Sequence, residues 1–290
     1  MGRTINLKML CCIVMLLAGM LGSCQQGYAQ KKGVKKIVLD AGHGGRDPGA
    51  RRFRLIKDEK DIALDVVLKL GKLLNDSLKD VEVIYTRKHD FYPELKERHA
   101  IANNANADLF VSIHVNATAG TRTKVQNGYK YVGKGSKRRK VPVYTTVVNR
   151  ETKATGTETY ILGLHRTSQK EKAIEEFGDN VTEEPGLLDE NDPMTQILVA
   201  QYTQAFQNKS ISFGDKVEKS FVKVTGRKSA GVKQKGLEVL AGSAMPGVLI
   251  ELGFINNVED EIYLNSEEGQ YQLAYAIFRA IREYKAELSR

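Results

Sequence analysis

Four short stretches of the chain each carry a metal-capable side chain, placed just beyond a predicted strand or at the start of a predicted helix. They are IVLDAGHGG at 37–45, KDEKD at 57–61, LFVSIHVNA at 109–117 and PGVLIELGFINN at 246–257, and they contribute His43, Glu59, His114 and Glu251. Two imidazoles and two carboxylates are the groups that a hydrolytic zinc site requires. Because these residues are dispersed along the sequence, the fold must bring four distant segments together.

Apolar runs of strand type alternate with stretches of helical period. Strands are predicted at 35–40, 81–86, 108–114, 157–162 and 247–251, and helices at 93–105, 193–209, 267–287 and from Asp58 onward. Strands that alternate with helices favour a parallel sheet with crossover connections. The 290 residues, 41% of them hydrophobic, therefore predict an α/β fold. We expect a single domain with a mostly parallel twisted sheet flanked by helices and a basic, hairpin-like insertion.

The four metal-capable residues share a place in this fold. Ligand sites in open α/β sheets collect beyond the carboxyl ends of the strands, where His43, His114 and Glu251 are predicted to lie. Asp58 is a plausible helix cap and puts Glu59 in the first turn. Taken alone, a histidine in a Gly-rich loop is usually a surface group, and a glutamate in a first turn usually serves the helix dipole. Glu251 is harder to dismiss, because a carboxylate directly after GVLI is costly to bury without a partner.

The first residues have the features of an export signal. Arg3 and Lys8 precede an uncharged apolar stretch, 9–21, which fits a signal-peptide core and is short for a bilayer span. Two processing sites compete, a lipobox-like LGSC that ends in Cys24 and an ordinary site that ends at 29. We expect residues 1–29 to be a signal peptide, with a lipid anchor on Cys24 as one alternative and a membrane anchor formed by 9–21 as a less favoured one. We expect residues 30–290 to act in the periplasm or cell envelope. All three cysteines lie in or beside this leader, so we expect no disulfide in the mature domain.

Further motifs complete a resemblance to a known family. The ordered set DAGHGGRDPGA, EKD, LKERHAIANNANADLFVSIHVNA, GTETYIL and AMPGVLIELGFINNVED resembles the zinc-dependent N-acetylmuramoyl-L-alanine amidases, the AmiC-like peptidoglycan amidases. The resemblance covers most of residues 35–288 and implies that His43, Glu59 and His114 bind Zn²⁺ while Glu251 is the catalytic acid/base. It also implies hydrolysis of the amide between N-acetylmuramic acid and L-alanine in peptidoglycan, an activity that separates daughter cells.

The stretch 118–156 departs from the family pattern. It holds ten Lys and Arg against one Glu, so most of the net charge of +9 is local and a nucleic-acid partner loses its main support. Two alternating segments around a polar turn predict an exposed hairpin. We weigh a solvated loop without a partner against a surface that attracts stem-peptide carboxylates or an acidic protein.

A polar, acidic segment at 169–193 is the second departure. Related amidases can carry a segment here that covers the metal until an activator protein displaces it. The carboxylates that such a role would use are Glu175, Glu176, Glu183 and Glu184. Two other functions remain open for the whole chain: another zinc peptidase or deacetylase acting on cell-wall material, and a cell-wall binding protein without activity.

Overall fold

The computed structural model describes residues 33–181, 188 and 194–289. The predicted leader, with Cys24, and Glu183 and Glu184 of the acidic segment lie outside these residues. Within the described part of the chain, no helix is both long and apolar enough to cross a bilayer.

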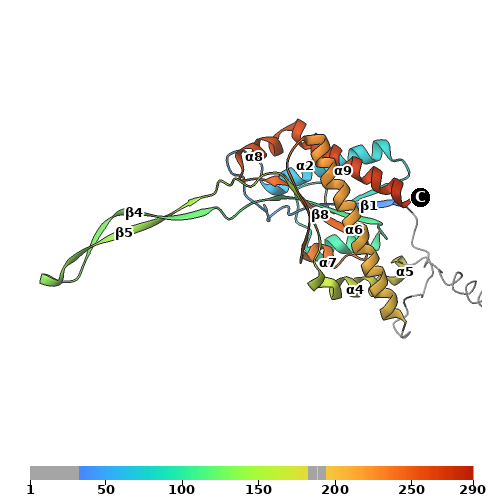
Figure 1. The fold of residues 1–290 in the computed structure, drawn as a ribbon, viewed down its shortest axis with the longest axis horizontal. Helices are drawn as coiled ribbons and strands as arrows, with labels where there is room; N and C mark the ends of the chain where they lie inside the picture. Colours follow the sequence, from blue (N-terminus) through green and yellow to red (C-terminus); the bar gives the residue numbers. More distant parts are fainter. Residues whose placement is uncertain (1–32, 182–187, 189–193, 290) are drawn as a thin grey trace, which may run out of the picture.

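The strands and helices follow one another along the chain as Figure 1 shows. The strands are β1 (Lys36–Ala41), β2 (Glu82–Tyr85), β3 (Leu109–Asn116), β4 (Thr121–Val132), β5 (Arg139–Asn149), β6 (Thr157–Leu162), β7 (Ser229–Lys235) and β8 (Gly247–Phe254). The helices are α2 (Glu59–Ser77), α3 (Leu95–Asn104), α4 (Thr167–Glu176), α5 (Gly178–Val181), α6 (Thr195–Thr225), α7 (Glu238–Ala241), α8 (Val258–Asn265) and α9 (Glu267–Leu288), with 3-10 turns η1 (Gly135–Lys137) and η2 (Leu164–Arg166).

A six-stranded sheet in the order β2-β1-β3-β8-β6-β7 forms the centre of the domain. Four of its five pairings are parallel, and β6 runs antiparallel to β8. The reversal has a topological cause. After β3 the chain leaves as β4, returns as β5 and enters β6 from the edge at which β3 ended, so β6 runs the opposite way. The predicted α/β fold with a mostly parallel sheet is confirmed.

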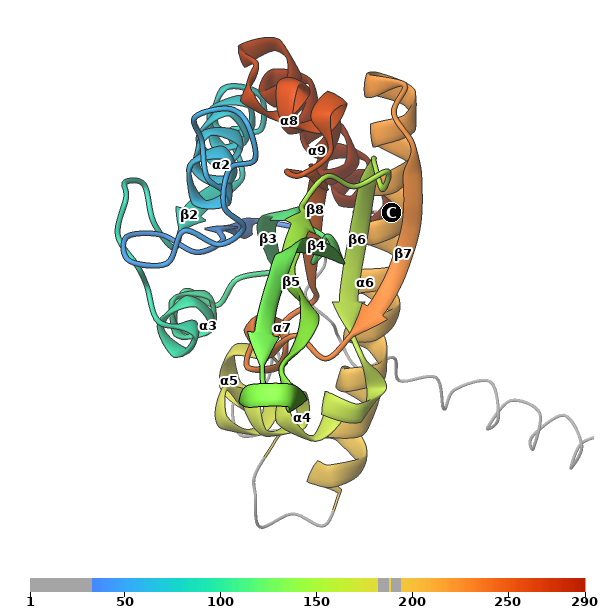
Figure 2. The same cartoon turned by 90° about the vertical axis from the view of Figure 1, so that its left-hand side faces the viewer.

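Strand side chains alternate between two cores, one on each face of the sheet. On one face, Ile37 and Leu39 pack with the apolar sides of α2, α6 and α9. On the other, Val38 and Phe110 pack with residues of α3 and α7, such as Leu240. Figure 2 shows these two groups of helices on either side of the strands. On the second face, farther along the strands, the side chains become polar, and there the candidate site lies.

One predicted helix was too short, and some elements of the structure were not predicted. The helix predicted at 193–209 continues to Thr225, because Phe213, Val217 and Phe221 extend its buried face at four-residue spacing. It ends at Gly226, whose φ of 66° is the left-handed conformation of a helix C-cap. β7 was not predicted, since this edge strand reads SAGVKQK and lacks apolar alternation. The short helices α7 and α8 were not predicted either.

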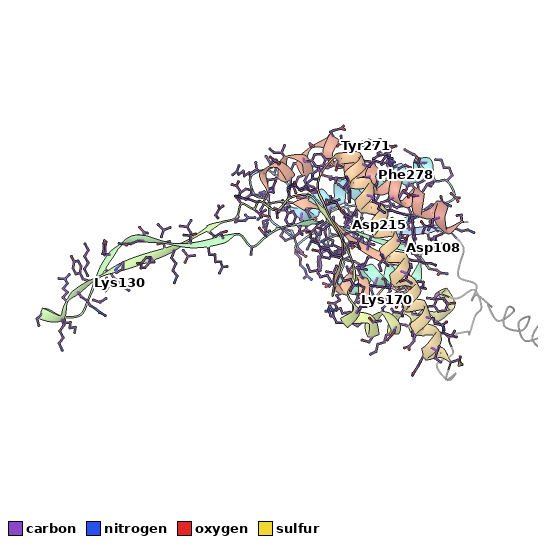
Figure 3. All side chains as sticks on the ribbon, viewed as in Figure 1. Asp108, Lys130, Lys170, Asp215, Tyr271 and Phe278 are labelled. Atoms are coloured by element: carbon purple, nitrogen blue, oxygen red, sulfur yellow. The ribbon has the colours of Figure 1, made fainter. Side chains whose placement is uncertain are left out.

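Strands β4 and β5, with the turn between them, form an arm at residues 121–149 that projects from the body of the molecule (Figure 1). The strands are 12 and 11 residues long, or about 40 Å at the usual rise of ~3.4 Å per residue. Every residue of β4 except Val132 is exposed, and Figure 3 shows side chains such as Lys130 standing away from the ribbon. The predicted hairpin is therefore present in the structure.

Candidate metal centre

Three of the four metal-capable residues converge on one point. The ligand atoms of His43, Glu59 and His114 all lie within 4.8 Å of one another. Oε1 of Glu59 is 3.1 Å from Nε2 of His43 and 2.9 Å from Nδ1 of His114. The two imidazole rings meet edge to face, with centroids 4.9 Å apart. Segments far apart in the sequence thus supply two nitrogens and one oxygen to a single place.

The Gly-rich loop after β1 holds His43 in an uncommon backbone conformation. Its φ of 58° is left-handed, a region that few non-glycine residues adopt. Gly44 and Asp47 exchange two backbone hydrogen bonds of 2.9 Å, and Arg98 donates to the carbonyl oxygen of His43 at 2.8 Å. These contacts fix the direction in which the imidazole points.

Asp47 orients the ring of His43 and was not identified from the sequence. Its Oδ2 lies 2.7 Å from Nδ1 of His43. A carboxylate on one ring nitrogen fixes the tautomer and leaves the other nitrogen, here Nε2, to bind a metal. The signal in the sequence was a carboxylate four residues after the histidine in the same loop.

The start of α2 places Glu59. Asp58 is the N-cap, as predicted, and its backbone N–H donates to Asp61 at 3.2 Å. Glu59 is buried and accepts hydrogen bonds from the backbone N–H groups of Ala50 (2.6 Å) and Val115 (3.0 Å). Gly49 is required beside it, because a Cβ there would lie 2.5 Å from Oε2 of Glu59.

The electrostatics of the cluster favour positive charge. Burial disfavours the charged form of His43, but hydrogen bonds and Coulombic attraction from Glu59 and Asp47 outweigh it and raise the pKa of His43 to about 9. Burial also opposes ionisation of Glu59, yet the hydrogen bonds to His114 and His43 hold the pKa of Glu59 below its usual range. A buried carboxylate that raises the pKa of His43 in this way will equally attract a cation.

Glu251 lies beside the cluster rather than in it. In the pairing of β3 with β8 it is opposite His114. Its Oε2 is buried and makes no hydrogen bond with any residue that the structure describes. Burial raises the pKa of Glu251 to about 7, and the attraction of His114 only partly offsets this. A carboxyl group whose pKa is near neutrality can both accept and return a proton.

Polar residues of β6 and β7 extend this face of the sheet, and these residues were not predicted from the sequence. Glu158 is opposite Glu251 in the pairing of β6 with β8 and accepts a hydrogen bond from Tyr160 at 2.6 Å. It also accepts from Asn116 at 3.1 Å and forms an ion pair with Lys233 at 2.8 Å. The alternation in TETYIL could have indicated a polar strand face, but its neighbour β7 was not predicted.

A buried ion pair lies beneath the Gly-rich loop. Oδ1 of Asp40 accepts from Arg98 and Thr86, both at 2.7 Å, and Oδ2 accepts from Ser112 at 2.6 Å. Burial opposes the charge, but Arg98 and the hydroxyl groups hold the pKa of Asp40 below its usual range. Arg98 therefore links this pair to the backbone of His43.

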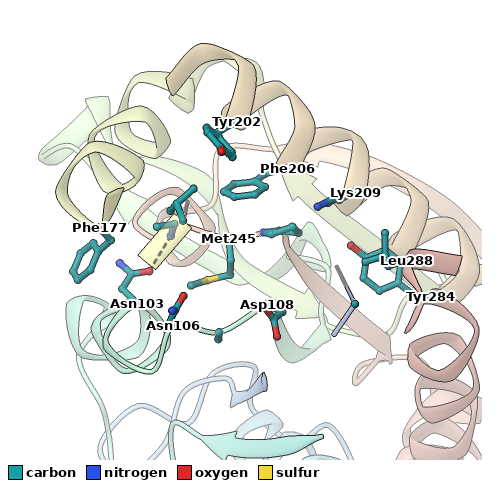
Figure 4. A pocket seen from close by; sticks show the side chains of 15 residues that line it. Asn103, Asn106, Asp108, Phe177, Tyr202, Phe206, Lys209, Met245, Tyr284 and Leu288 are labelled. Carbon is teal, nitrogen blue, oxygen red and sulfur yellow. Dashed lines mark hydrogen bonds between the residues drawn. The ribbon is translucent and has the colours of Figure 1, made fainter. Parts of the chain in front are cut away.

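Of the acidic segment, the structure describes α4 and α5. Glu175 and Glu176 are exposed on α4, and Lys170 of the same helix donates to the carbonyl oxygen of Met245 at 2.6 Å. Met245 precedes β8, so α4 lies at the end of that strand opposite to Glu251. These two glutamates therefore do not reach the metal cluster. The pocket in Figure 4 is also at this end and is lined by residues such as Asp108, Phe206 and Met245.

Comparisons with known proteins identify relatives of the chain. Over residues 37–283 the chain matches the protein family described as N-acetylmuramoyl-L-alanine amidase. It is 28% identical over 264 residues to the amidase AmiC of Escherichia coli O6:H1. This match covers 91% of this chain and 56% of AmiC. A probable amidase AmiB of Haemophilus influenzae is 28% identical, over 84% of this chain and 51% of AmiB. The chain thus spans about half the length of these curated relatives.

Solved structures share the fold. The crystal structure of an N-acetylmuramoyl-L-alanine amidase from Clostridium difficile 630 has a TM-score of 0.59 and 25% identity, over 87% of this chain and 97% of that one. The CwlD amidase from Clostridioides difficile, solved in complex with the GerS lipoprotein, has a TM-score of 0.57 and 25% identity, over 87% and 99%.

Proposed function

Since the chain belongs to the N-acetylmuramoyl-L-alanine amidase family, we propose that it hydrolyses the amide between N-acetylmuramic acid and L-alanine in peptidoglycan. The observation that carries the proposal is the convergence of His43, Glu59 and His114 beside a buried carboxylate oxygen of Glu251, which has no hydrogen-bond partner among the described residues. The cluster would hold the metal, and Glu251 would transfer the proton. Cell-wall remodelling and daughter-cell separation are the cellular role proposed with it.

The donor set supports Zn²⁺ as the metal. Two imidazole nitrogens and one carboxylate oxygen make up a common ligand set of catalytic zinc, whereas magnesium and calcium prefer oxygen ligands. Asp47 on the remote nitrogen of His43 is the usual outer partner of a zinc-binding histidine. When bound, zinc supplies a Lewis acid that polarises a carbonyl and acidifies water.

The protein groups then divide the remaining work. Oε2 of Glu251 accepts a proton from the attacking water, and Glu251 then returns this proton to the amine of the departing L-alanine. A pKa of about 7 suits this role. Glu59 stays ionised, and Asp47 with Arg98 keeps His43 in place. Polar groups of β6 and β7 line the face beside Glu251, where the substrate would lie.

Product analysis tests the reaction. Purified sacculi incubated with the protein should release free peptides that begin with L-alanine, and a chelator should prevent the release. Peptides cut at another bond would indicate a peptidase, and release of acetate alone would indicate a deacetylase. Stoichiometric zinc without any hydrolysis would leave a cell-wall binding protein.

We infer in addition that the protein is exported to the periplasm or cell envelope, which rests on the basic and apolar pattern of residues 1–29. Lipidation of Cys24 is testable by labelling with a fatty acid. Label on the wild-type protein that disappears in Cys24→Ala indicates a lipoprotein, whereas an unlabelled protein that starts at Gln30 indicates ordinary cleavage.

Regulation by an activator protein is a further proposal, supported by the complex of the CwlD amidase with a lipoprotein. If residues of the acidic segment cover the metal, removing 182–193 should raise basal activity on sacculi. Unchanged activity in that variant would argue against autoinhibition.

A further inference from the structure

The arm at residues 121–149 has a composition unlike the rest of the domain. It carries eight Lys and Arg and no Asp or Glu, so none of these cations has a carboxylate partner within the arm. Its strands pair only with each other in the described sheets. A two-stranded ribbon is marginally stable in water, and this one also exposes large apolar side chains to solvent. These features indicate a surface for a partner.

The pairing of the strands sorts the side chains of the arm onto two faces. Directly opposed residues of an antiparallel pair share a face. Gln126, Tyr129 and Tyr131 oppose Tyr144, Pro142 and Lys140 in turn. Residues 140, 142 and 144 are every second residue of β5 and therefore share one face. The three tyrosines thus lie on one face, here called the tyrosine face. Val125 opposes Thr145 and Val147 opposes Thr123, so both valines lie on the other face.

Cations accompany the aromatic rings of the tyrosine face. Nζ of Lys140 lies 4.0 Å from the ring centroid of Tyr129, and Cζ of Arg138 lies 4.6 Å from that of Tyr131. The three tyrosines are 56–60% exposed, so one side of each ring remains available. The face therefore offers flat apolar surfaces and positive charge in close succession along an extended ribbon.

The base of the arm is fixed beside the metal centre. Asn256, which follows β8, donates from Nδ2 to the carbonyl oxygens of both Thr118 and Arg150, and so joins the outgoing and returning chains. Arg150 in turn donates to the carbonyl oxygen of Arg51, in the loop that leads into α2. A polymer held along the arm would consequently pass close to the cluster.

Charge and shape narrow the choice of partner. A second copy of the arm would bring sixteen cations together and is disfavoured by repulsion. A narrow ribbon has no concavity for a small ligand, whereas it can follow a long chain. Rings on which sugar rings can pack, beside cations that can pair with carboxylates, complement a glycan that carries acidic peptides.

We propose that the tyrosine face of the arm binds peptidoglycan strands outside the metal centre, with tyrosine rings packed on sugars and arm cations paired with stem-peptide carboxylates. This inference rests on the proposed function for its ligand. The arm then supplies affinity for the polymer, and the metal centre supplies the chemistry.

Binding and turnover are tested separately. Binding to protein-free sacculi is measured by pelleting in a Glu251→Gln background, so that the ligand stays intact. The triple variant Y129T/Y131T/Y144T should bind about tenfold more weakly, which corresponds to about 1.4 kcal/mol. The matched control V125T/V147T also introduces threonine, but on the opposite face of the arm. Its valines are 48 and 50% exposed, close to the exposure of the tyrosines. This control should bind within twofold of the parent. Added salt should weaken binding of parent and control alike.

Turnover is compared on sacculi and on a soluble muramyl peptide with Glu251 restored. The triple variant should lose activity on sacculi through a higher KM and keep its rate on the small substrate. Equal losses on both substrates, or equal binding by the two variants, would overturn the inference. A third result would also overturn it. If anionic phospholipid vesicles bind the parent as tightly as sacculi do but do not bind the triple variant, the tyrosine face is a membrane-binding surface. If the wild-type protein cleaves neither substrate, the proposed function fails, while pelleting still tests the arm.

Discussion

The candidate metal centre (His43, Glu59 and His114, with the Asp40–Arg98 pair beneath it) and the arm both concentrate charge, but one buries its charges and the other exposes them. Glu59 and Asp40 are 5% and 0% exposed, and their oxygens accept hydrogen bonds from neighbouring groups at 2.6–3.1 Å. On the arm, eight cations stand in solvent without a carboxylate partner in the same element. The candidate metal centre therefore holds its charged groups in a fixed geometry, whereas the arm presents a positive electrostatic potential over an extended surface.

The difference predicts where substitutions will act. Buried charges that are fully hydrogen-bonded form networks in which the loss of one member leaves the others unsatisfied. Exposed charges are screened and contribute little to stability. Changes at the metal centre should therefore affect metal binding, chemistry and folding, whereas changes on the arm should affect the binding of a partner.

Loss of a ligand should have the largest effect. His114→Ala leaves two donors in the cluster. Loss of a residue that only orients a metal ligand lowers metal affinity by up to about 100-fold, so loss of a ligand should lower zinc affinity by more than that and bring activity below detection. Metal content by mass spectrometry and hydrolysis of sacculi measure this. His165→Ala, at an exposed histidine outside the cluster, serves as control and should retain both. Full zinc occupancy in His114→Ala would exclude this residue as a ligand.

Glu251→Gln should separate metal binding from turnover. The amide keeps the size of the side chain but cannot carry the proton, so kcat should fall by roughly 10² to 10⁴ while zinc content stays at the wild-type level. Single-turnover hydrolysis and metal analysis of the same preparation check this. A rate near that of wild type would show that another group acts as the base.

Two ion pairs of similar length compare buried with exposed charge directly. Arg98 and Asp40 lie 2.7 Å apart and are 2% and 0% exposed, whereas Arg46 and Glu94 lie 2.6 Å apart at the surface. We expect Arg98→Met to lower the free energy of unfolding by about 3–5 kcal/mol and Arg46→Met by about 0–1 kcal/mol. Urea denaturation measures both. Equal losses would contradict the expected difference between a buried and an exposed ion pair.

Lys170 extends the contrast to a buried cation that has no carboxylate partner among the described residues. Burial lowers its pKa to about 7, while the unfolded chain keeps its proton up to about 10.5. The unfolded state therefore binds more protons between these values, and stability should rise with pH, by about 2 kcal/mol from pH 7 to 9. Lys170→Met should flatten this rise, and Lys172→Met, on the exposed side of α4, should not. The same slope in both variants would assign the rise to other groups.

Removal of the arm should have the smallest effect on folding. Thr121 is opposite Asn149, so residues 122–148 can be replaced by a two-residue Asn-Gly turn. We expect the free energy of unfolding to change by less than about 1 kcal/mol, since exposed side chains contribute little. A larger loss in thermal or urea unfolding would mean that the arm supports the domain.

The sequence predicted those features that depend on local patterns. His43, His114 and Glu251 follow runs of buried strand type, and the cap at Asp58 placed Glu59, so the metal cluster could be anticipated. Contacts made through the fold could not. Asn256 clamps the arm, and Glu158 lies beside Glu251 only because β6 runs antiparallel to β8. β7 escaped prediction because a polar edge strand has no apolar alternation.

Reconstitution with metal tests the central claim most directly. The protein is stripped with a chelator, zinc is added back in steps, and peptides beginning with L-alanine are quantified by mass spectrometry after incubation with sacculi. The metal cluster predicts no release without zinc and recovery that reaches its full value at about one equivalent per chain. Undiminished release from the stripped protein, or no release at any zinc level, would contradict a zinc amidase.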